Sequence, residues 1–532
     1  MPSMSQYTKH ERKVIRLTKG IGHKIIAWLT IQKLLLYAVL FIIQLVTLTS
    51  VFLLLYQFIN PLLFLIIING IGVIFSIYVV NTNLAAEYKI AWIMFIMVFS
   101  VIGIVAYLIF GRRKLSRRKV KKYNKLVELK EQCIQDSVLL KQAGKNDRFV
   151  TKVAKLIFDD IQLPISQVSD IEYFNDGMKY YQRLLNELNN AQKFIFLEFF
   201  IIKKGRMWDG IFEILKQKAQ AGIEVRVTYD DLGSFRHLPD KFGKNCYENG
   251  IKLYCFNKLR PFLDISQNNR THRKMVIIDG KCGFTGGINI GDEYINLIQP
   301  LGHWKDSGIM IKGSAVKSLT TLFLTTWQLH YGHENTDRFL TNHHQEKFKK
   351  DVYCIPFADI PAIGHTLCLD VYLLMIYQAK KYVYINTPYL IIDGRMKAAL
   401  ISAAKSGIDV RISVPHIPDK RSAFALTKSF YKSLVLAGVK IYEYRPGFLH
   451  AKSIVSDDQY AVIGTSNMDF RSFYLHYENN IFLNDHDTLL KMKEDYLETC
   501  NQSILISIDE VIKISIFKRI YRGLLRLLAP LM

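Results

Sequence analysis

The sequence is poor in acidic residues, and its cysteines follow no pattern. Its 532 residues include 70 Lys and Arg against 46 Asp and Glu, a formal net charge of +24. This excess of positive charge points to anionic partners: nucleic acid, an acidic membrane surface or phosphorylated substrates. The seven cysteines include no CxxC pair, and no histidine is spaced from them as a zinc ligand. We therefore expect reduced thiols in a cytosol-facing protein, and no metal site.

Charge of either sign is nearly absent between Lys33 and Arg112, where Glu87 and Lys89 are the only charged residues. This region, 34–110, contains three apolar segments near or above the length that crosses a bilayer as a helix: 34–56, 62–80 and 90–110. The apolar region is too long for a secretion signal, and no small-residue cleavage site follows a short core. The segments also lack the polar face of helices in a soluble core. The sequence predicts N-terminal transmembrane helices in a multi-pass protein of the cell membrane.

The topology of this region stays open. The N-terminal segment 1–33 is basic, and nine basic residues with no acid lie between positions 112 and 125. The positive-inside rule places both flanks in the cytoplasm, which requires an even number of crossings, whereas three segments give an odd number. Either the segment 62–80, which contains Asn69, Gly70 and Gly72, is re-entrant, or the N-terminus violates the rule. We expect the catalytic region that follows to be cytoplasmic, and the side of the N-terminal segment stays open.

Two further segments are basic and helix-prone. Residues 111–170 form a connector whose first part either lies against anionic headgroups or is a solvated helix. Residues 511–532 contain no acid, and Lys518, Arg522 and Arg526 recur at four-residue spacing with apolar side chains largely on another side. This pattern predicts a basic amphipathic helix that lies in a bilayer interface or packs on the rest of the protein.

The chain between these segments repeats itself. Three apolar β-forming stretches recur in order, with helical spacing at 207–218 and 396–405 between the first and second stretch of each copy. The paired stretches are 193–202 with 381–390, 221–227 with 406–412, and 249–254 with 437–442. Strand–helix–strand order predicts a mixed α/β layer fold in each of two halves, 171–345 and 346–510.

Each half also contains the pattern His-x-Lys-x4-Asp, followed at the same offset by a small-residue turn that ends in Asn. The residues are His272, Lys274, Asp279 and Asn289 in the first half, and His450, Lys452, Asp457 and Asn467 in the second. One copy alone would be read as an exposed strand face, but two copies with the same downstream element are not expected by chance. Because strand side chains alternate, each His and Lys share a face and can reach one phosphate. Two imidazoles can attack phosphorus and protonate a leaving oxygen, while two ammonium groups neutralise the phosphate.

The paired motifs resemble the phospholipase D superfamily, and the resemblance covers most of the chain after about residue 170. It implies two tandem α/β/α repeats that form one pseudo-two-fold catalytic unit. It also implies that His272 attacks phosphorus to give a phosphohistidine and that His450 serves as general acid and base. The sequence itself does not decide between the two histidines. Lys274, Lys452, Asn289 and Asn467 would then hold the non-bridging oxygens, where negative charge develops.

The carboxylates need separate treatment. Four residues separate Asp279 and Asp457 from their lysines, enough to place them at the strand end, where they can fix the following turn without touching substrate. A nucleophilic histidine also needs a carboxylate on its other nitrogen. The resemblance suggests Glu478 as the partner of His450, and Asp306 is our candidate for His272. A plain surface acid is the alternative for each.

Several strings narrow the resemblance to bacterial cardiolipin synthases, among them 271–280, 286–294, 303–306, 447–452, 467–473 and 229–233. That family implies transfer of a phosphatidyl group between two phosphatidylglycerol molecules, giving cardiolipin and glycerol, with no metal or nucleotide cofactor. Anionic membrane lipids suit a basic, membrane-anchored protein. The sequence departs from the family at His476, where Asn is expected, and in having three apolar segments where two anchors are expected.

Other functions remain possible from sequence. A membrane phospholipase D, or a phosphatidyltransferase that uses another alcohol, would carry the same motifs, because acceptor choice depends on pocket shape. A nuclease of the superfamily would suit the charge, but the apolar segments argue against it and no nucleic acid partner is expected. The sequence leaves open the acceptor alcohol, the oligomeric state and the acyl-chain preference.

Overall fold

The computed structural model describes residues 42, 46, 49–50, 53–54, 60–111, 135–238, 241–259, 268–340, 347–361, 364 and 366–531. The predicted basic segment 1–33, most of the apolar segment 34–56 and the connector residues 112–134 lie outside the described residues.

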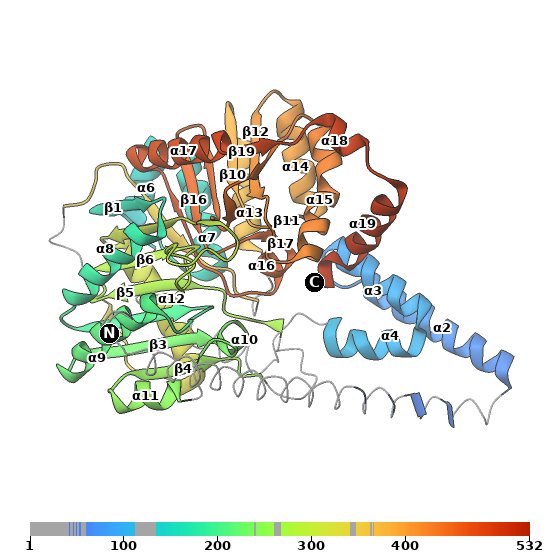
Figure 1. Ribbon diagram of the computed structural model, residues 1–532, viewed down its shortest axis with the longest axis horizontal. Helices are drawn as coiled ribbons and strands as arrows, with labels where there is room; N and C mark the ends of the chain where they lie inside the picture. Colours follow the sequence, from blue (N-terminus) through green and yellow to red (C-terminus); the bar gives the residue numbers. More distant parts are fainter. Residues whose placement is uncertain are drawn as a thin grey trace, which may run out of the picture.

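Two sheets form the body of the protein (Figure 1). The first has the strand order β1-β8-β6-β5-β2-β3-β4 and the second β19-β13-β12-β10-β15-β16-β18-β9. The first sheet comprises β1 (Asp170–Phe174), β2 (Phe194–Phe199), β3 (Glu224–Asp230), β4 (Lys252–Phe256), β5 (Lys274–Ile278), β6 (Cys282–Gly286) and β8 (Gly308–Lys312). The second comprises β9 (Cys354–Phe357), β10 (Tyr382–Asn386), β12 (Asp409–Pro415), β13 (Lys440–Tyr444), β15 (Ser453–Ser456), β16 (Tyr460–Gly464), β18 (Asn480–Leu483) and β19 (Ser503–Leu505).

The two sheets are copies of one another. Read from the opposite edge, the second order is β9-β18-β16-β15-β10-β12-β13, which matches the first strand for strand, with β19 added. In each sheet the three repeated stretches pair in parallel, and the motif strand pairs antiparallel with the first of them. The predicted α/β repeat is therefore confirmed, and both motif strands, β5 and β15, lie inside their sheets with every residue buried.

Helices pack on these sheets where amphipathic spacing gives them an apolar face. Aspartate side chains cap the N-termini of several of them, as Asp176 does for α8 and Asp393 for α14. In the first half the helices are α8 (Gly177–Asn189), α9 (Arg206–Gln220), α10 (Asp231–Ser234), α11 (Phe242–Glu248) and α12 (Ala315–Tyr331). In the second they are α13 (Leu367–Gln378), α14 (Gly394–Lys405), α15 (Arg421–Val435), α16 (Phe470–Tyr474) and α17 (His486–Asn501). The end of the predicted connector forms α6 (Ser137–Asn146) and α7 (Arg148–Ile161), and one face of α7 is buried in the common core.

Short strands join the halves at a seam. β7 (His303–Lys305) of the first half pairs in parallel with β14 (Gly447–Leu449) of the second. A second parallel bridge joins Thr271 to Tyr477. In each of these two contacts, the next residue along the chain is a motif histidine in one half and an acid in the other. The seam therefore determines which histidine and acid side chains lie together.

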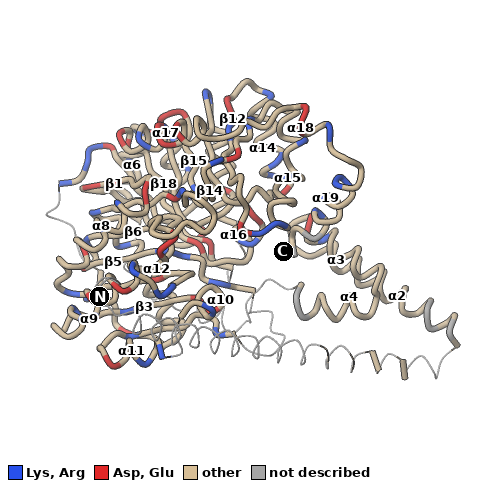
Figure 2. Tube along the Cα trace, viewed as in Figure 1, with Lys and Arg blue, Asp and Glu red and all other residues tan. Residues whose placement is uncertain are grey.

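The apolar N-terminal region forms α2 (Pro61–Val80), α3 (Ala86–Val98), α4 (Ser100–Ala106) and the π-helical turn η2 (Tyr107–Gly111). These helices extend away from the sheets (Figure 1), and almost no charged residue marks them in Figure 2. The start of α3 contacts the second half: the Glu87 carboxylate accepts from the Gly394 amide at 2.7 Å, and the Tyr88 ring lies 5.8 Å from that of Phe470. Within the part of the chain that the structure describes, no helix is both long and apolar enough to cross a membrane, so the predicted transmembrane helices are not confirmed.

The predicted C-terminal helix is α19 (Ile516–Leu528), preceded by α18 (Ile508–Ile512) and followed by η5 (Ala529–Leu531). One side of α19 packs on α15, where the Arg526 guanidinium lies over the Phe430 ring. The apolar residues Ile516, Phe517, Ile520, Tyr521 and Leu524 stay exposed, Phe517 to 81%. A helix is present where the sequence predicts one, and it packs on the protein, as one of the two expected placements has it, while an apolar side faces outward; its placement in a bilayer interface stays a prediction.

Candidate active site

At the seam, the backbone of each motif histidine hydrogen-bonds to the opposite half of the protein. The His272 amide donates to the Tyr477 carbonyl at 2.8 Å, and the His450 amide donates to the Lys305 carbonyl at 2.7 Å. The next residues after these two acceptors are Glu478 and Asp306. The backbone pairing therefore brings each histidine alongside a carboxylate from the opposite half.

The imidazoles contact those carboxylates directly. His272 Nδ1 lies 2.9 and 3.0 Å from the two Glu478 oxygens, and His450 Nδ1 lies 2.7 Å from Asp306 Oδ2. The predicted pairing, Glu478 with His450 and Asp306 with His272, is therefore wrong, and the true pairing is crossed. The resemblance suggested Glu478 for His450, but across the seam each acid reaches the histidine of the other half.

The two pairs set the protonation of the site. Contact with the imidazoles lowers the pKa of both Glu478 and Asp306 despite their burial, so both are ionised. Burial lowers the pKa of His272 to about 3 and that of His450 to about 4, against the raising effect of the carboxylates. An ionised carboxylate only accepts hydrogen bonds, so each neutral ring carries its proton on Nδ1. Nε2 of each ring is then left with a free lone pair.

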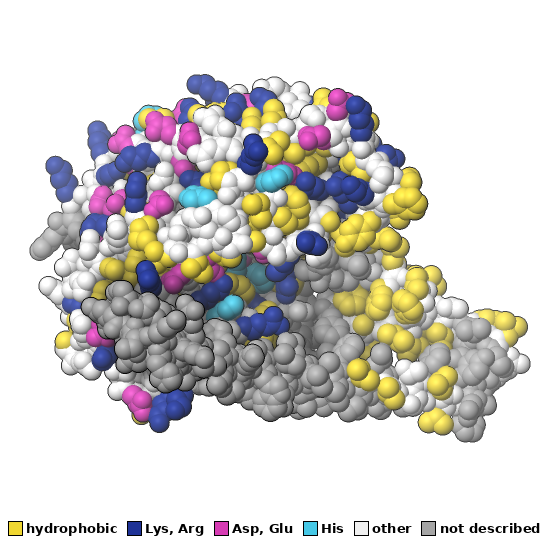
Figure 3. Space-filling view, viewed as in Figure 1, with side chains coloured by type: hydrophobic (Ala, Val, Ile, Leu, Met, Phe, Trp, Pro, Cys, Tyr) yellow, Lys and Arg dark blue, Asp and Glu magenta, His cyan; other side chains and the backbone are white. Residues whose placement is uncertain are grey.

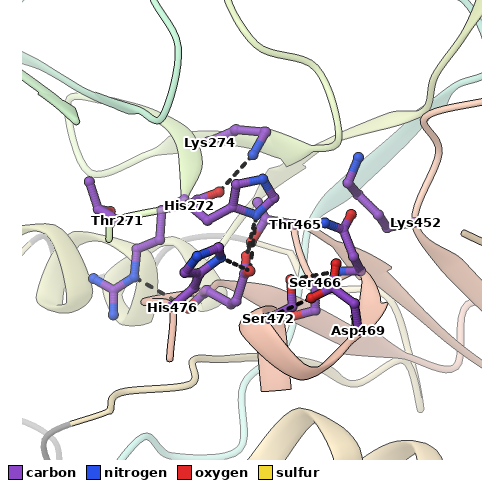
Figure 4. Close-up of polar contacts among 12 residues, drawn as sticks. Thr271, His272, Lys274, Lys452, Thr465, Ser466, Asp469, Ser472 and His476 are labelled. Carbon is purple, nitrogen blue, oxygen red and sulfur yellow. Dashed lines mark hydrogen bonds and ion pairs between the residues drawn. The ribbon is translucent and has the colours of Figure 1, made fainter. Parts of the chain in front are cut away.

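The two motif lysines occupy the same site. Lys274 Nζ donates to the His272 carbonyl at 2.7 Å, and Lys452 Nζ donates in the same way to the His450 carbonyl. Burial lowers the pKa of Lys452 to about 8, while burial and the charge of Lys452 hold the pKa of Lys274 well below its usual value. Figure 4 shows Lys452 beside His272 and Lys274 of the other half. Two close ammonium groups with depressed pKa values fit a site that receives an anion.

The motif aspartates lie at the other end of their strands. Asp279 accepts from the amides of residues 192, 193 and 194, at the start of β2. Asp457 accepts from the amides of residues 380, 381 and 382, at the start of β10. Both have positive φ, 56° and 57°. Although both belong to the motif that carries the catalytic residues, these contacts give them a structural part: they tie the motif strand to the first strand of each repeat, beyond the expected role of fixing the turn that follows.

The motif asparagines lie near the histidines. Asn289 accepts from the Ile201 amide at 3.1 Å and donates to the Tyr294 hydroxyl at 2.9 Å, and the Tyr294 ring lies 5.5 Å from that of His450. The Asn467 side-chain oxygen is buried without a hydrogen-bond partner among the described residues. Their role as phosphate ligands stays a prediction.

Sequence reasoning missed a polar network behind His272. Arg273 Nε donates to the Glu478 carbonyl at 3.3 Å, and its guanidinium lies 3.9 Å from Glu198, which accepts from the Thr271 hydroxyl. Burial raises the pKa of Glu198. Strand register places Asn386 at the position of the second half that matches Glu198. The network around His272 therefore has no copy around His450. An acid inside an otherwise apolar strand was the available signal.

His476, the departure from the expected Asn, also belongs to the site. Its ring centroid lies 5.4 Å from that of His272, and its Nδ1 lies 3.7 Å from Glu478 (Figure 4). Ligand atoms of His272, His476 and Glu478 all lie within 4.8 Å of one another, close enough to hold a metal ion. Sequence reasoning expected no metal site and missed this cluster, since its members come from both halves. The hydrogen bonds of Glu478 with His272 and with the Thr465 hydroxyl already explain the position of its carboxylate.

Known proteins match this chain over its two halves. The family described as "Cardiolipin synthase, PLD-like domain" matches residues 184–327 and 372–499, and "Phospholipase_D-nuclease N-terminal" matches residues 70–112. A cardiolipin synthase of Geobacillus kaustophilus is 34% identical over 477 residues, which cover 88% of this chain and 93% of that protein. An uncharacterized protein of Streptococcus mutans is 37% identical over 461 residues, 86% of this chain and 99% of the relative.

A solved structure shares the fold. Phosphatidylserine synthase of Haemophilus influenzae superposes with a TM-score of 0.54 and 13% identity, over 72% of this chain and 97% of that one. At this identity the likeness concerns the fold alone.

Proposed function

The chain belongs to the cardiolipin synthase family of phospholipase D-like enzymes, and we propose that it joins two phosphatidylglycerol molecules into cardiolipin, with release of glycerol. The observation that carries this proposal is the crossed pair of neutral imidazoles, each held by a carboxylate of the opposite half beside two buried lysines. Such a site provides a nucleophile, a proton carrier and charge neutralisation for one phosphodiester.

In the first step, His272 Nε2 forms a bond to phosphorus while the bond from phosphorus to the glycerol oxygen breaks. The imidazole gains positive charge as it bonds, and Glu478 stabilises this charge through Nδ1–H. His450, protonated when the anionic substrate is bound, gives its proton to the leaving glycerol oxygen. The product of the step is a phosphatidyl-histidine and free glycerol.

In the second step, a hydroxyl of the acceptor phosphatidylglycerol attacks the same phosphorus. Neutral His450 takes the hydroxyl proton, the new oxygen–phosphorus bond forms, and the bond from phosphorus to His272 breaks. The enzyme returns to its starting protonation, and atoms and charge balance over the cycle. Lys274 and Lys452 would stabilise the non-bridging oxygens in both transition states.

We assign the nucleophile to His272 because its carboxylate is the more firmly held. Glu478 contacts His272 through both oxygens and also accepts from the Thr465 hydroxyl, whereas Asp306 contacts His450 through one oxygen and accepts from the Ser307 amide with the other. A firmly fixed, ionised partner fixes the tautomer of the ring and stabilises the positive charge that the ring gains on attack.

The same proposal includes attachment to the cell membrane through the apolar N-terminal region, with the catalytic body in the cytoplasm. Apolar side chains gather over α2, α3 and α19 in Figure 3, and α2 and α3 expose many large ones. Side chains of this kind are costly in water and stable in a bilayer. Anionic lipids, the proposed substrates, would then lie beside the catalytic body.

The test uses purified full-length protein in mixed micelles of detergent and phosphatidylglycerol, with lipids and glycerol measured by mass spectrometry. Wild type should release cardiolipin and glycerol in equal amounts, and His272→Ala and His450→Ala should release neither. His486→Ala, a change at an exposed histidine on α17, is the matched control and should behave as wild type. Phosphatidic acid without cardiolipin would mean that water is the acceptor, and it would replace the proposal with a phospholipase D.

A further inference from the structure

Arg471, in the second half, is a cation without an ion-pair partner among the residues that the structure describes. It lies on α16, and its Nε is buried with no hydrogen-bond partner among the described residues. No carboxylate in that part of the chain forms an ion pair with it. A buried guanidinium nitrogen without a partner is unfavourable, so such groups call for an explanation.

Two acids at or beside α16 have contacts of their own. Asp469 accepts from the Ser472 amide at 2.8 Å as the N-cap of α16. Asp393 accepts from the Tyr474 hydroxyl at 2.7 Å and pairs with Arg395 at 3.2 Å. Within the described part of the chain, the positive charge of Arg471 is therefore left for an anion that comes from outside the protein.

The position of α16 connects the reaction site with the apolar helices. On one side, the Asn467 amide donates to the Ser472 hydroxyl at 3.1 Å, which ties α16 to the motif turn. On the other side, the Tyr88 ring of α3 lies 5.8 Å from Phe470 and 6.1 Å from Tyr474. A lipid that comes from the apolar helices toward the histidines would pass this helix.

Arg471 also lies close to the reacting histidine. The His476 amide donates to the Arg471 carbonyl at 2.9 Å, and the charge of Arg471 contributes to lowering the pKa of His476. The ring of His476 lies 5.4 Å from that of His272. His476 thus contacts both the backbone of Arg471 and the ring of the histidine that attacks phosphorus.

We propose that Arg471 binds the phosphate of the acceptor phospholipid while that lipid's free hydroxyl attacks the phosphatidyl-histidine. The inference rests on the proposed function, and it names a second phosphate subsite for the same reaction. In cardiolipin the two phosphates are joined through one glycerol, so the acceptor phosphate must lie one glycerol length from the reacting phosphorus. Lys274 and Lys452 are engaged with the reacting phosphate, and Arg471 supplies the separate positive charge that the second phosphate requires. The planar guanidinium fits two phosphate oxygens at once.

The subsite gives the acceptor an advantage over alcohols that lack a phosphate. Loss of a charge-assisted, two-point contact should weaken use of the phospholipid acceptor by about 10- to 100-fold. Attack by a small neutral alcohol should be unaffected, since such an alcohol has nothing to place on Arg471. The ratio of the two products therefore reports the subsite separately from the donor half of the reaction.

The experiment lets phosphatidylglycerol and ethanol compete as acceptors in mixed micelles of the full-length protein. The expected result for Arg471→Gln is a ratio of cardiolipin to phosphatidylethanol that falls about 10- to 100-fold, with phosphatidylethanol formation within about twofold of wild type. Arg471→Lys keeps the charge without the planar fork and should give an intermediate ratio. The matched control is Arg183→Gln, which removes a half-buried arginine on α8 that pairs with Glu172 and should leave the ratio unchanged.

Two results would overturn the subsite. One is an unchanged ratio in both Arg471 variants. The other is an equal loss of both products in Arg471→Lys while thermal unfolding stays normal, which would place Arg471 on the reacting phosphate instead. A wild type that makes phosphatidylethanol but no cardiolipin would overturn the proposed function itself, and this outcome is visible before any variant is compared.

Discussion

Replacing each of the two carboxylates separately tests the crossed pairing of histidines and acids. Glu478→Gln and Asp306→Asn keep the shape of each side chain and remove its charge. If Glu478 serves the nucleophile His272 and Asp306 serves the proton carrier His450, the two variants fail at different chemical tasks. A donor lipid whose leaving group is p-nitrophenol separates these tasks, because p-nitrophenolate leaves without a proton.

The size of the effect follows from the contacts. Glu478 lies 2.9 and 3.0 Å from His272 Nδ1, and His272 gains positive charge as it bonds to phosphorus. A unit charge pair at about 4 Å is worth about 4 kcal/mol at an effective dielectric constant of 20. With tenfold for each 1.4 kcal/mol, loss of the charge should slow formation of the phosphatidyl-histidine by about 10² to 10⁴-fold. Asp306→Asn should slow the reaction of natural phosphatidylglycerol to a similar extent.

The assay is the burst of p-nitrophenolate in a stopped-flow instrument. Asp306→Asn and His450→Ala should release the burst at close to the wild-type rate, whereas Glu478→Gln and His272→Ala should not. The opposite pattern would make His450 the nucleophile. A pattern that groups Glu478→Gln with His450→Ala would refute the crossed pairing itself.

Three further predictions concern the lysines, the motif aspartates and His476. Lys452 carries its charge only below its lowered pKa of about 8, so kcat/KM should fall as the pH rises through that value. In Lys452→Arg, the fall of kcat/KM in a pH–rate profile should move to higher pH. An unmoved profile would mean that another group causes this fall. Asp279→Ala and Asp457→Ala each remove the acceptor of three backbone amides, and each should lower the free energy of unfolding by about 1–3 kcal/mol in a urea titration. Their turnover per folded molecule should stay near that of wild type, and a loss as large as that of a histidine variant would place them in the chemistry. His476→Asn restores the residue that the family pattern leads one to expect, and kcat should stay within about threefold; a larger loss would give the ring a part in catalysis.

Much of the fold could be predicted from the sequence because its signals are local. Alternating apolar stretches and the segments between them predicted the paired strands, and the structure places β2 and β10 in matching positions of two matching sheets. The two motifs predicted which histidines and lysines meet, since strand alternation alone puts each pair on one face. That one site would use both halves was predicted from the resemblance to the phospholipase D superfamily, not from the local patterns.

Predictions about the partners of the histidines failed because they depend on the seam. The pairing of β7 with β14, and of Thr271 with Tyr477, decides which acid stands next to which ring. No local pattern encodes that pairing. Glu198 and Arg471 were not predicted as part of the site for a related reason. A buried acid in a strand, or an arginine in a short helix without a partner among the described residues, becomes informative only when its surroundings are known.

The central claim is that His272, supported by Glu478 of the opposite half, carries the phosphatidyl group. The most direct measurement is mass spectrometry of peptides from His450→Ala protein quenched during reaction with the p-nitrophenol donor, because this variant forms the intermediate and resolves it slowly. The account predicts a phosphatidyl adduct on the peptide that contains His272, absent when Glu478→Gln is added. An adduct on any other residue, or an adduct of full yield in the Glu478→Gln background, would contradict it.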